Sequence, residues 1–136
     1  MPTWLIFAVL CVGVWGVWGF VAKLTTAQGV HPLTLSAISS ITGVIATWLV
    51  WFSVQPPFLR SAQLPMTVLT GLCGSLGAVA FFLALSHGRA SIVVPMSALY
   101  PAITILLSLI FLGEQPSTPQ TLGIILALIA SVLLGM

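Results

Sequence analysis

Apolar residues gather into five long stretches along this chain, and short polar segments separate them. A helix needs roughly 17–25 residues to cross the hydrocarbon core of a bilayer, and the first four stretches meet that length. The fifth is marginal unless it begins near Pro119. We therefore predict an all-α, polytopic membrane protein with five transmembrane helices in a single domain over residues 1–136. The helices are expected at about 4–22, 33–54, 64–86, 90–112 and 119–136.

The fourth stretch contains two prolines, Pro95 and Pro101. Proline has no N–H to donate, and its ring pushes against the carbonyl four residues earlier, here those of Ser91 and Ser97. Within a membrane such a helix continues only where neighbouring groups or a wet cavity satisfy the freed carbonyls. We expect a kink with Pro95 and Pro101 as hinge residues, beside a transport pathway.

The composition excludes several classes of protein. Hydrophobic residues make up 60% of the 136 positions and charged residues 3%, against about 25% charged in soluble domains. The expected solvent is therefore a lipid bilayer. No basic patch favours nucleic acid, and no nucleophile–base set or metal-ligand spacing favours an enzyme, a metal or a cofactor. Cys11 and Cys73 lie in apolar stretches, where cysteine behaves as a small hydrophobe.

Basic residues in the loops barely favour one orientation. Five spans place Arg60 on one side and Lys23 with Arg89 on the other, and cytoplasmic loops carry the excess of basic residues. The two sides of the membrane differ by one basic residue at most. Two interpretations remain open: the chain inserts in both orientations, or so few charges carry little information.

Polar residues, most of them with hydroxyl groups, recur on single helix faces. The stripes comprise Ser97, Tyr100, Thr104 and Ser108 on the fourth helix and Ser36, Ser40, Gly43 and Thr47 on the second. For most of them hydrogen bonding between helices is the plainer interpretation. Ser97 and Tyr100, beside the carbonyl freed by Pro101, are candidates for substrate contact.

Trp15 and Trp18 lie deep in the first helix. Trp15 follows Trp4 by eleven positions, which is roughly 16 Å along a helix axis and near mid-membrane. The pair belongs either to ordinary core packing or to a stacking wall for an amphipathic substrate. We include both residues among the substrate-binding candidates.

Small residues at every fourth position form a ridge on the last helix: Gly123, Ala127, Ser131 and Gly135. Such ridges let two helices approach closely. The partner helix can belong to the same chain, to a second copy or to another protein. A non-transporting membrane subunit that packs through this ridge is thus an alternative function.

Charged residues avoid the centres of the predicted spans. Lys23, His87 and Glu114 all lie at helix ends, where a solvated position is the plainer interpretation and gating or coupling the alternative. No carboxylate occupies the midplane to relay protons through the bilayer. Transport without a buried carboxylate proton relay is the expectation.

Two segments carry a resemblance to a known family. Residues 15–23 (WGVWGFVAK) with 32–35 (PLTL) resemble the opening of an EamA domain, and residues 94–104 (VPMSALYPAIT), 112–115 (LGEQ) and 123–127 (GIILA) resemble its closing half. EamA domains belong to the drug/metabolite transporter superfamily. Most members resemble a tandem pair of such domains, and this chain is similar to the five-helix prokaryotic subfamily with one domain. Ser39 stands roughly where the family often carries an arginine.

The resemblance implies a carrier in a prokaryotic cell membrane that moves a small metabolite or drug-like compound. It implies a substrate cavity between two inverted repeats, so the second repeat must come from another chain. An antiparallel homodimer with dual topology, working by alternating access, is the resulting expectation.

Overall fold

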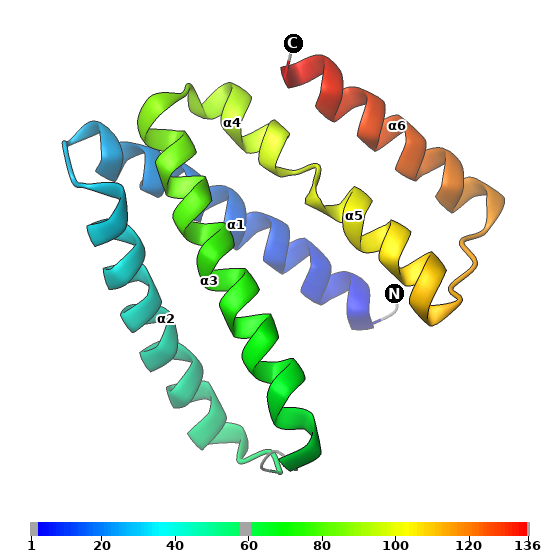
Figure 1. Cartoon of the computed structure of the whole chain (residues 1–136), viewed down its shortest axis with the longest axis horizontal. Helices are drawn as coiled ribbons and strands as arrows, with labels where there is room; N and C mark the ends of the chain where they lie inside the picture. Colours follow the sequence, from blue (N-terminus) through cyan, green and yellow to red (C-terminus); the bar gives the residue numbers. More distant parts are fainter. Residues whose placement is uncertain (1–2, 58–60, 136) are drawn as a thin grey trace. The chain divides into compact units, whose positions relative to one another are not determined.

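The computed structural model describes residues 3–57 and 61–135, which form helices and no strand. The elements in chain order are α1 (Thr3–Ala27), α2 (Pro32–Val54), the 3-10 turn η1 (Ser61–Gln63), α3 (Leu64–His87), α4 (Ala90–Ser97), α5 (Tyr100–Leu107), the π-helical turn η2 (Ser108–Leu112) and α6 (Thr118–Gly135). Figure 1 shows these helices along the chain. The predicted all-α class is confirmed.

The lengths and hydropathy of the helices fit a multi-pass membrane protein. Within the described residues, four segments are long and apolar enough to cross a bilayer, and a shorter apolar helix follows them. Large apolar side chains such as Phe7, Leu76 and Ile110 are exposed on these helices. In water this surface would be unfavourable, whereas lipid tails solvate it. Of the positions used for the orientation argument, Arg60 lies outside the described residues, as does Met136 at the end of the last predicted helix.

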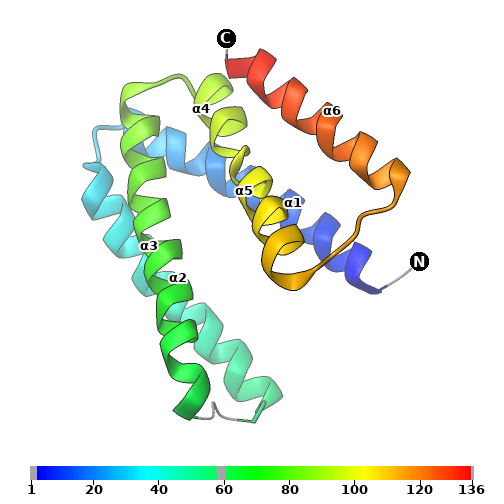
Figure 2. The ribbon, with the colours of Figure 1, turned by 45° about the vertical axis from the view of Figure 1, so that its right-hand side comes forward.

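The chain divides into two compact units, Met1–His87 and Gly88–Met136. In the first unit α3 packs against both α1 and α2 (Figures 1 and 2). Phe82 and Leu85 of α3 are fully buried, and Ala22 of α1 and Ser36 of α2 are nearly so. A small residue at position 22 lets the helices approach closely, which suits packing by van der Waals contact in lipid.

Local signals explain where α2 begins and ends. His31 is its N-cap: the imidazole Nδ1 accepts a hydrogen bond from the Leu33 N–H at 3.3 Å, and Pro32 opens the helix. Proline suits that position because the first helical N–H has no partner inside the helix. At the other end Gln55 adopts a left-handed conformation (φ 48°) and donates its N–H to the Trp51 carbonyl at 2.7 Å.

The second unit is built from a broken helix and α6, which packs against α4. The predicted fourth span, Ala90–Leu112, is not one continuous α-helix. Its first α-helical piece ends at Ser97 and the next begins at Tyr100, so Ala98 and Leu99 form a turn between the two prolines. In Figure 2, α6 runs back alongside α4 and α5 in the opposite direction.

Candidate functional site

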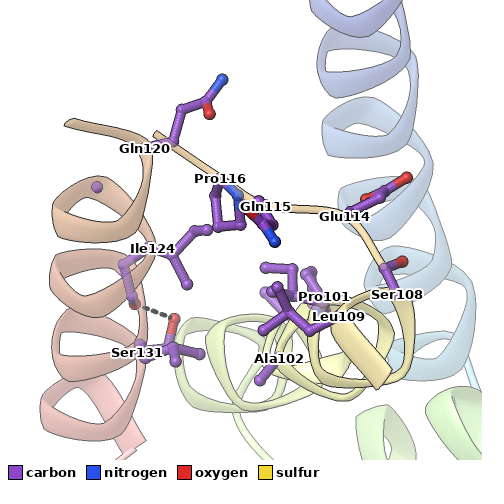
Figure 3. Close-up of a pocket in the computed structure, with 15 residues that line it drawn as sticks. Pro101, Ala102, Ser108, Leu109, Glu114, Gln115, Pro116, Gln120, Ile124 and Ser131 are labelled. Carbon is purple, nitrogen blue, oxygen red and sulfur yellow. Dashed lines mark hydrogen bonds between the residues drawn. The ribbon is translucent and has the colours of Figure 1, made fainter. Parts of the chain in front are cut away.

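The second unit has an open cavity of about 750 Å³ between the broken helix and α6 (Figure 3). We call it the α6 cavity. Its lining comprises Ala98, Pro101, Ala102, Ile105, Ser108 and Leu109 from the broken helix, Glu114, Gln115 and Pro116 from the following linker, and Gln120, Gly123, Ile124, Ala127, Leu128 and Ser131 from α6. This volume is within the range of roughly 300–1,000 Å³ that is usual for small-molecule sites.

The break in the helix forms one wall of the α6 cavity. The Ala98 N–H donates to the Val94 carbonyl at 2.9 Å and closes α4, while the Ala102 N–H donates to the Leu99 carbonyl at 3.0 Å and opens α5. Pro101 lies in the first turn of α5, where its missing N–H is tolerated. Pro95 lies inside α4 and Pro101 in the first turn of α5, and Ala98 and Pro101, on either side of the turn at Ala98–Leu99, both line the cavity wall.

A π-helical turn shapes the far end of the same wall. It runs over Ser108–Leu112 and ends at Gly113, whose φ of 65° is left-handed. The Ser108 carbonyl accepts the N–H groups of Gly113 and, at 3.4 Å, of Glu114. Glycine takes this conformation without the steric penalty that a Cβ brings. The tight turn places Glu114 and Gln115 at the rim of the cavity.

Capping of α6 fixes the third part of the lining. Ser117 precedes the helix, and its N–H donates to the Oε1 of Gln120 at 2.7 Å. The Thr121 N–H in turn donates to the Ser117 carbonyl at 2.9 Å. This is one half of a capping box, in which the third helical side chain accepts from the backbone N–H of the cap residue. It holds Gln120 at the cavity with its amide oxygen already used.

The lining is apolar along most of its length and polar at the linker end. Figure 3 shows Gln115 extending toward Pro101 and Leu109, while Glu114 lies at the edge beside Ser108. On α6 the Ser131 hydroxyl donates to the Ala127 carbonyl at 2.9 Å, so its hydrogen is used within the helix. None of the fifteen lining residues is basic.

A smaller cavity of about 220 Å³ lies within the first unit. We call it the serine cavity, since its lining comprises Trp18, Ser36, Ser39, Ser40, Gly74, Ser75, Ala78 and Phe82. Trp18 forms its aromatic wall: the indole stacks on Phe81 with ring centroids 5.1 Å apart and an interplanar angle of 16°, and it packs on Phe82 at 5.3 Å.

The structure places six residues singled out in the sequence around the α6 cavity. They are one hinge proline, one hydroxyl residue of the fourth-helix stripe, the acidic residue at a helix end and three members of the small-residue ridge: Pro101, Ser108, Glu114, Gly123, Ala127 and Ser131. The ridge therefore faces a cavity along part of its length. Gly135 is the last residue of α6.

Four other candidates line neither cavity: Trp15, Pro95, Ser97 and Tyr100. The Ser97 hydroxyl donates to the Val94 carbonyl at 2.8 Å. Trp15 and Tyr100 are exposed. Ser97 and Tyr100 are nevertheless direct neighbours of Ala98 and Pro101 in the chain.

The basic candidates lie in the first unit. Lys23 of α1 donates from Nζ to the Leu85 carbonyl of α3 at 2.8 Å. His87 approaches the Leu83 carbonyl with Nδ1 at 2.9 Å. A carbonyl only accepts, so this contact requires the hydrogen on Nδ1. Both side chains thus bond to carbonyls in the last turns of α3; the Leu85 carbonyl has no N–H donor within the helix, because α3 ends at His87.

Sequence reasoning missed Gln115 and Gln120 as lining residues. The signal for Gln120 was present, because Ser117 and Gln120 have the spacing of a capping box directly before an apolar run. No comparable pattern singles out Gln115, whose position follows from the π-helical turn.

Comparison with known proteins identifies the family. The family model described as the EamA-like transporter family matches residues 2–136. This chain belongs to the EamA-like transporter family. It is also similar to an uncharacterized protein of Methanocaldococcus jannaschii, with 32% identity over 136 residues that cover 99% of this chain and 98% of the relative. No solved structure gives a significant match. The resemblance to EamA domains noted in the sequence is confirmed over nearly the whole chain.

Proposed function

We propose that this EamA-like protein carries small metabolites or drug-like compounds across a prokaryotic cell membrane by alternating access. The α6 cavity is the observation that carries the proposal. It is of ligand size, it lies between apolar helices, and one wall is a helix broken at Ala98–Leu99. Broken helices beside a central site are typical of secondary transporters.

A second copy of the chain would complete the site. Five spans per chain and nearly balanced basic loop residues support an antiparallel homodimer with dual topology. In such a dimer, Ser97 and Tyr100 would contact substrate beside Pro101, and Trp15 and Trp18 would supply aromatic walls. Pro95 and Pro101 would act as the hinge.

Transport is proposed to run without a buried carboxylate proton relay. Glu114 is the only acidic residue of the chain, and it follows the end of η2 rather than lying inside a helix. Together with Lys23 and His87, it is proposed to influence gating from a helix end. Proton-coupled carriers, in contrast, keep ionisable groups within the membrane interior.

Flux through reconstituted liposomes tests the transport function. Purified protein is incorporated into vesicles, and uptake of a metabolite library is compared with protein-free vesicles, with and without a pH gradient. We expect protein-dependent uptake of at least one compound in the absence of the gradient. A strict requirement for the gradient would refute uncoupled transport, and no uptake under any gradient would refute a carrier.

Reporter fusions test the orientation. One reporter is active only in the cytoplasm and the other only outside it, and each is fused to the C-terminus. A dual-topology dimer predicts signal from both fusions. Signal from one alone would leave a carrier of fixed orientation and exclude the antiparallel dimer.

One observation favours the alternative of a non-transporting subunit. A Cβ built on Gly123 would meet nothing within 4 Å, so a partner helix has room to approach there. This alternative predicts co-purification with another protein, no self-association, and no flux. Self-association together with flux would support the carrier and contradict the non-transporting subunit.

A further inference from the structure

We propose that the α6 cavity selects a free organic cation with an apolar body, and that Glu114 at the linker end holds its charge. This inference rests on the proposed function and names the substrate class of the same cavity. Its basis is the distribution of charge and polarity along the lining.

Glu114 provides the only formal charge of the lining, since no other lining residue is acidic or basic. In the part of the chain that the structure describes, no basic side chain forms an ion pair with its carboxylate, and the residue is exposed. Its carboxylate is directed away from the rest of the lining in Figure 3, and because the residue is exposed, the side chain has room to turn toward a guest at the rim. An uncompensated carboxylate attracts a cation, and the attraction is stronger beside a low-dielectric wall than in water.

The helix termini at this end of the cavity oppose one another. The broken helix ends at Leu112, and its last carbonyls present partial negative charge; α6 begins at Thr118, and its first N–H groups present partial positive charge. Directly before α6, the Ser117 N–H donates to the Gln120 amide oxygen. The partial charges of these two helix ends offset each other. The full negative charge of Glu114 therefore decides that a ligand bound at this end should be positively charged.

The rest of the lining suits an apolar body. Between Gln120 and Ser131 the α6 face presents Gly123, Ile124, Ala127 and Leu128. Gln120 and Ser131 are eleven residues apart in the sequence, which is roughly 16 Å along a helix axis. A single ammonium group at one end of a short aryl or alkyl chain therefore matches both the length and the polarity of the cavity.

Matched ligands in neutral detergent test the proposal. The probes are 4-phenylbutylamine, which is a cation at pH 7, and 4-phenylbutanol, which is neutral and of nearly the same size. Binding to the purified protein in dodecyl maltoside is measured by equilibrium titration. We expect the amine to bind at least about tenfold more tightly than the alcohol, a difference of about 1.4 kcal/mol.

Variants locate the source of the preference. Glu114→Gln should bring the two affinities together while leaving that of the alcohol unchanged, and Glu114→Asp should keep most of the preference. Gly123→Leu fills the cavity and should weaken both ligands. Arg89→Gln, which changes a charge outside the lining, is the control and should leave the preference intact. Equal affinities in the wild type, or an unchanged preference in Glu114→Gln, would overturn the proposal.

Two further arms separate the remaining outcomes. Phosphatidylethanolamine added to the micelles presents the same ammonium chemistry on a lipid. If it displaces the amine stoichiometrically, the ligand is a lipid headgroup and the free-cation proposal fails.

Liposome flux is measured in parallel. Flux of other compounds without amine preference overturns this inference alone. Amine binding without any flux overturns the carrier and leaves a cation-binding cavity.

Discussion

Replacing Lys23 by methionine should loosen the packing of α1 on α3. In the structure, Lys23 Nζ donates to the Leu85 carbonyl at 2.8 Å, and Leu85 is fully buried. Because α3 ends at His87, this carbonyl belongs to the last turn and lacks a donor inside the helix. Methionine keeps much of the apolar stem and removes the charge and the donor.

The expected loss follows from the nature of that contact. Hydrogen bonds to charged groups contribute about 1.5–3 kcal/mol. A cation at a helix C-terminus adds about 0.3–1 kcal/mol. Lys23 is only partly buried, so we take about 2 kcal/mol for the sum, which corresponds to roughly a 30-fold shift in the unfolding equilibrium.

Unfolding in mixed micelles by titration with a denaturing detergent measures this shift, with tryptophan fluorescence as the readout. Trp18 is a suitable reporter because it stacks on Phe81 of α3. Lys23→Arg retains a cationic donor and should lose less than half as much stability. Arg89→Met is the matched control, since Arg89 forms no side-chain bond to the helix it caps. A loss below about 0.5 kcal/mol for Lys23→Met, within the usual range of surface substitutions, would refute the reasoning.

Three other substitutions have defined outcomes. Phe82→Ala removes a fully buried ring and should cost about 3 kcal/mol in the same detergent titration, with a smaller loss if lipid fills the space. Gly113→Ala forces a Cβ into a left-handed turn (φ 65°) with nothing within 4 Å, so backbone strain alone should cost about 1–2 kcal/mol in thermal unfolding. Gly123→Leu should abolish liposome flux without loss of folding. Gly71→Leu is the control and should leave flux unchanged, because Gly71 also has open space around it but lies outside both cavities. Equal effects of the two substitutions on flux would contradict a role for the α6 cavity.

The helical fold could be predicted because each signal is local. Apolar runs of membrane length define the spans, and His31 with Pro32 marks the start of α2. The two prolines predicted a disturbance of the fourth span, and the structure shows a two-residue turn at Ala98–Leu99 between α4 and α5. The difference arises because the missing N–H groups of Pro95 and Pro101 affect neighbouring turns, and two weakened turns favour separate helices over one kinked helix.

The composition of the cavities could be predicted only in part. Gly123, Ala127 and Ser131 were recognisable as one face from their spacing, but spacing cannot say whether that face meets a helix or an open space. Gln115 reaches the lining because η2 winds with a π-helical turn, and nothing in residues 108–112 predicts that turn. Periodicity assumes a constant 3.6 residues per turn. It therefore cannot predict the direction of side chains that come after a π-helical turn in the chain.

The break at Ala98–Leu99 also has a mechanical consequence. It leaves α5 and η2, together residues 100–112, as a lever of roughly 20 Å with its fulcrum at the break. A bend of about 20°, the size of an ordinary helix kink, would swing its Gly113 end through roughly 7 Å while α4 stays packed on α6. The displacement grows with distance from the fulcrum, so it is largest where Glu114 lies.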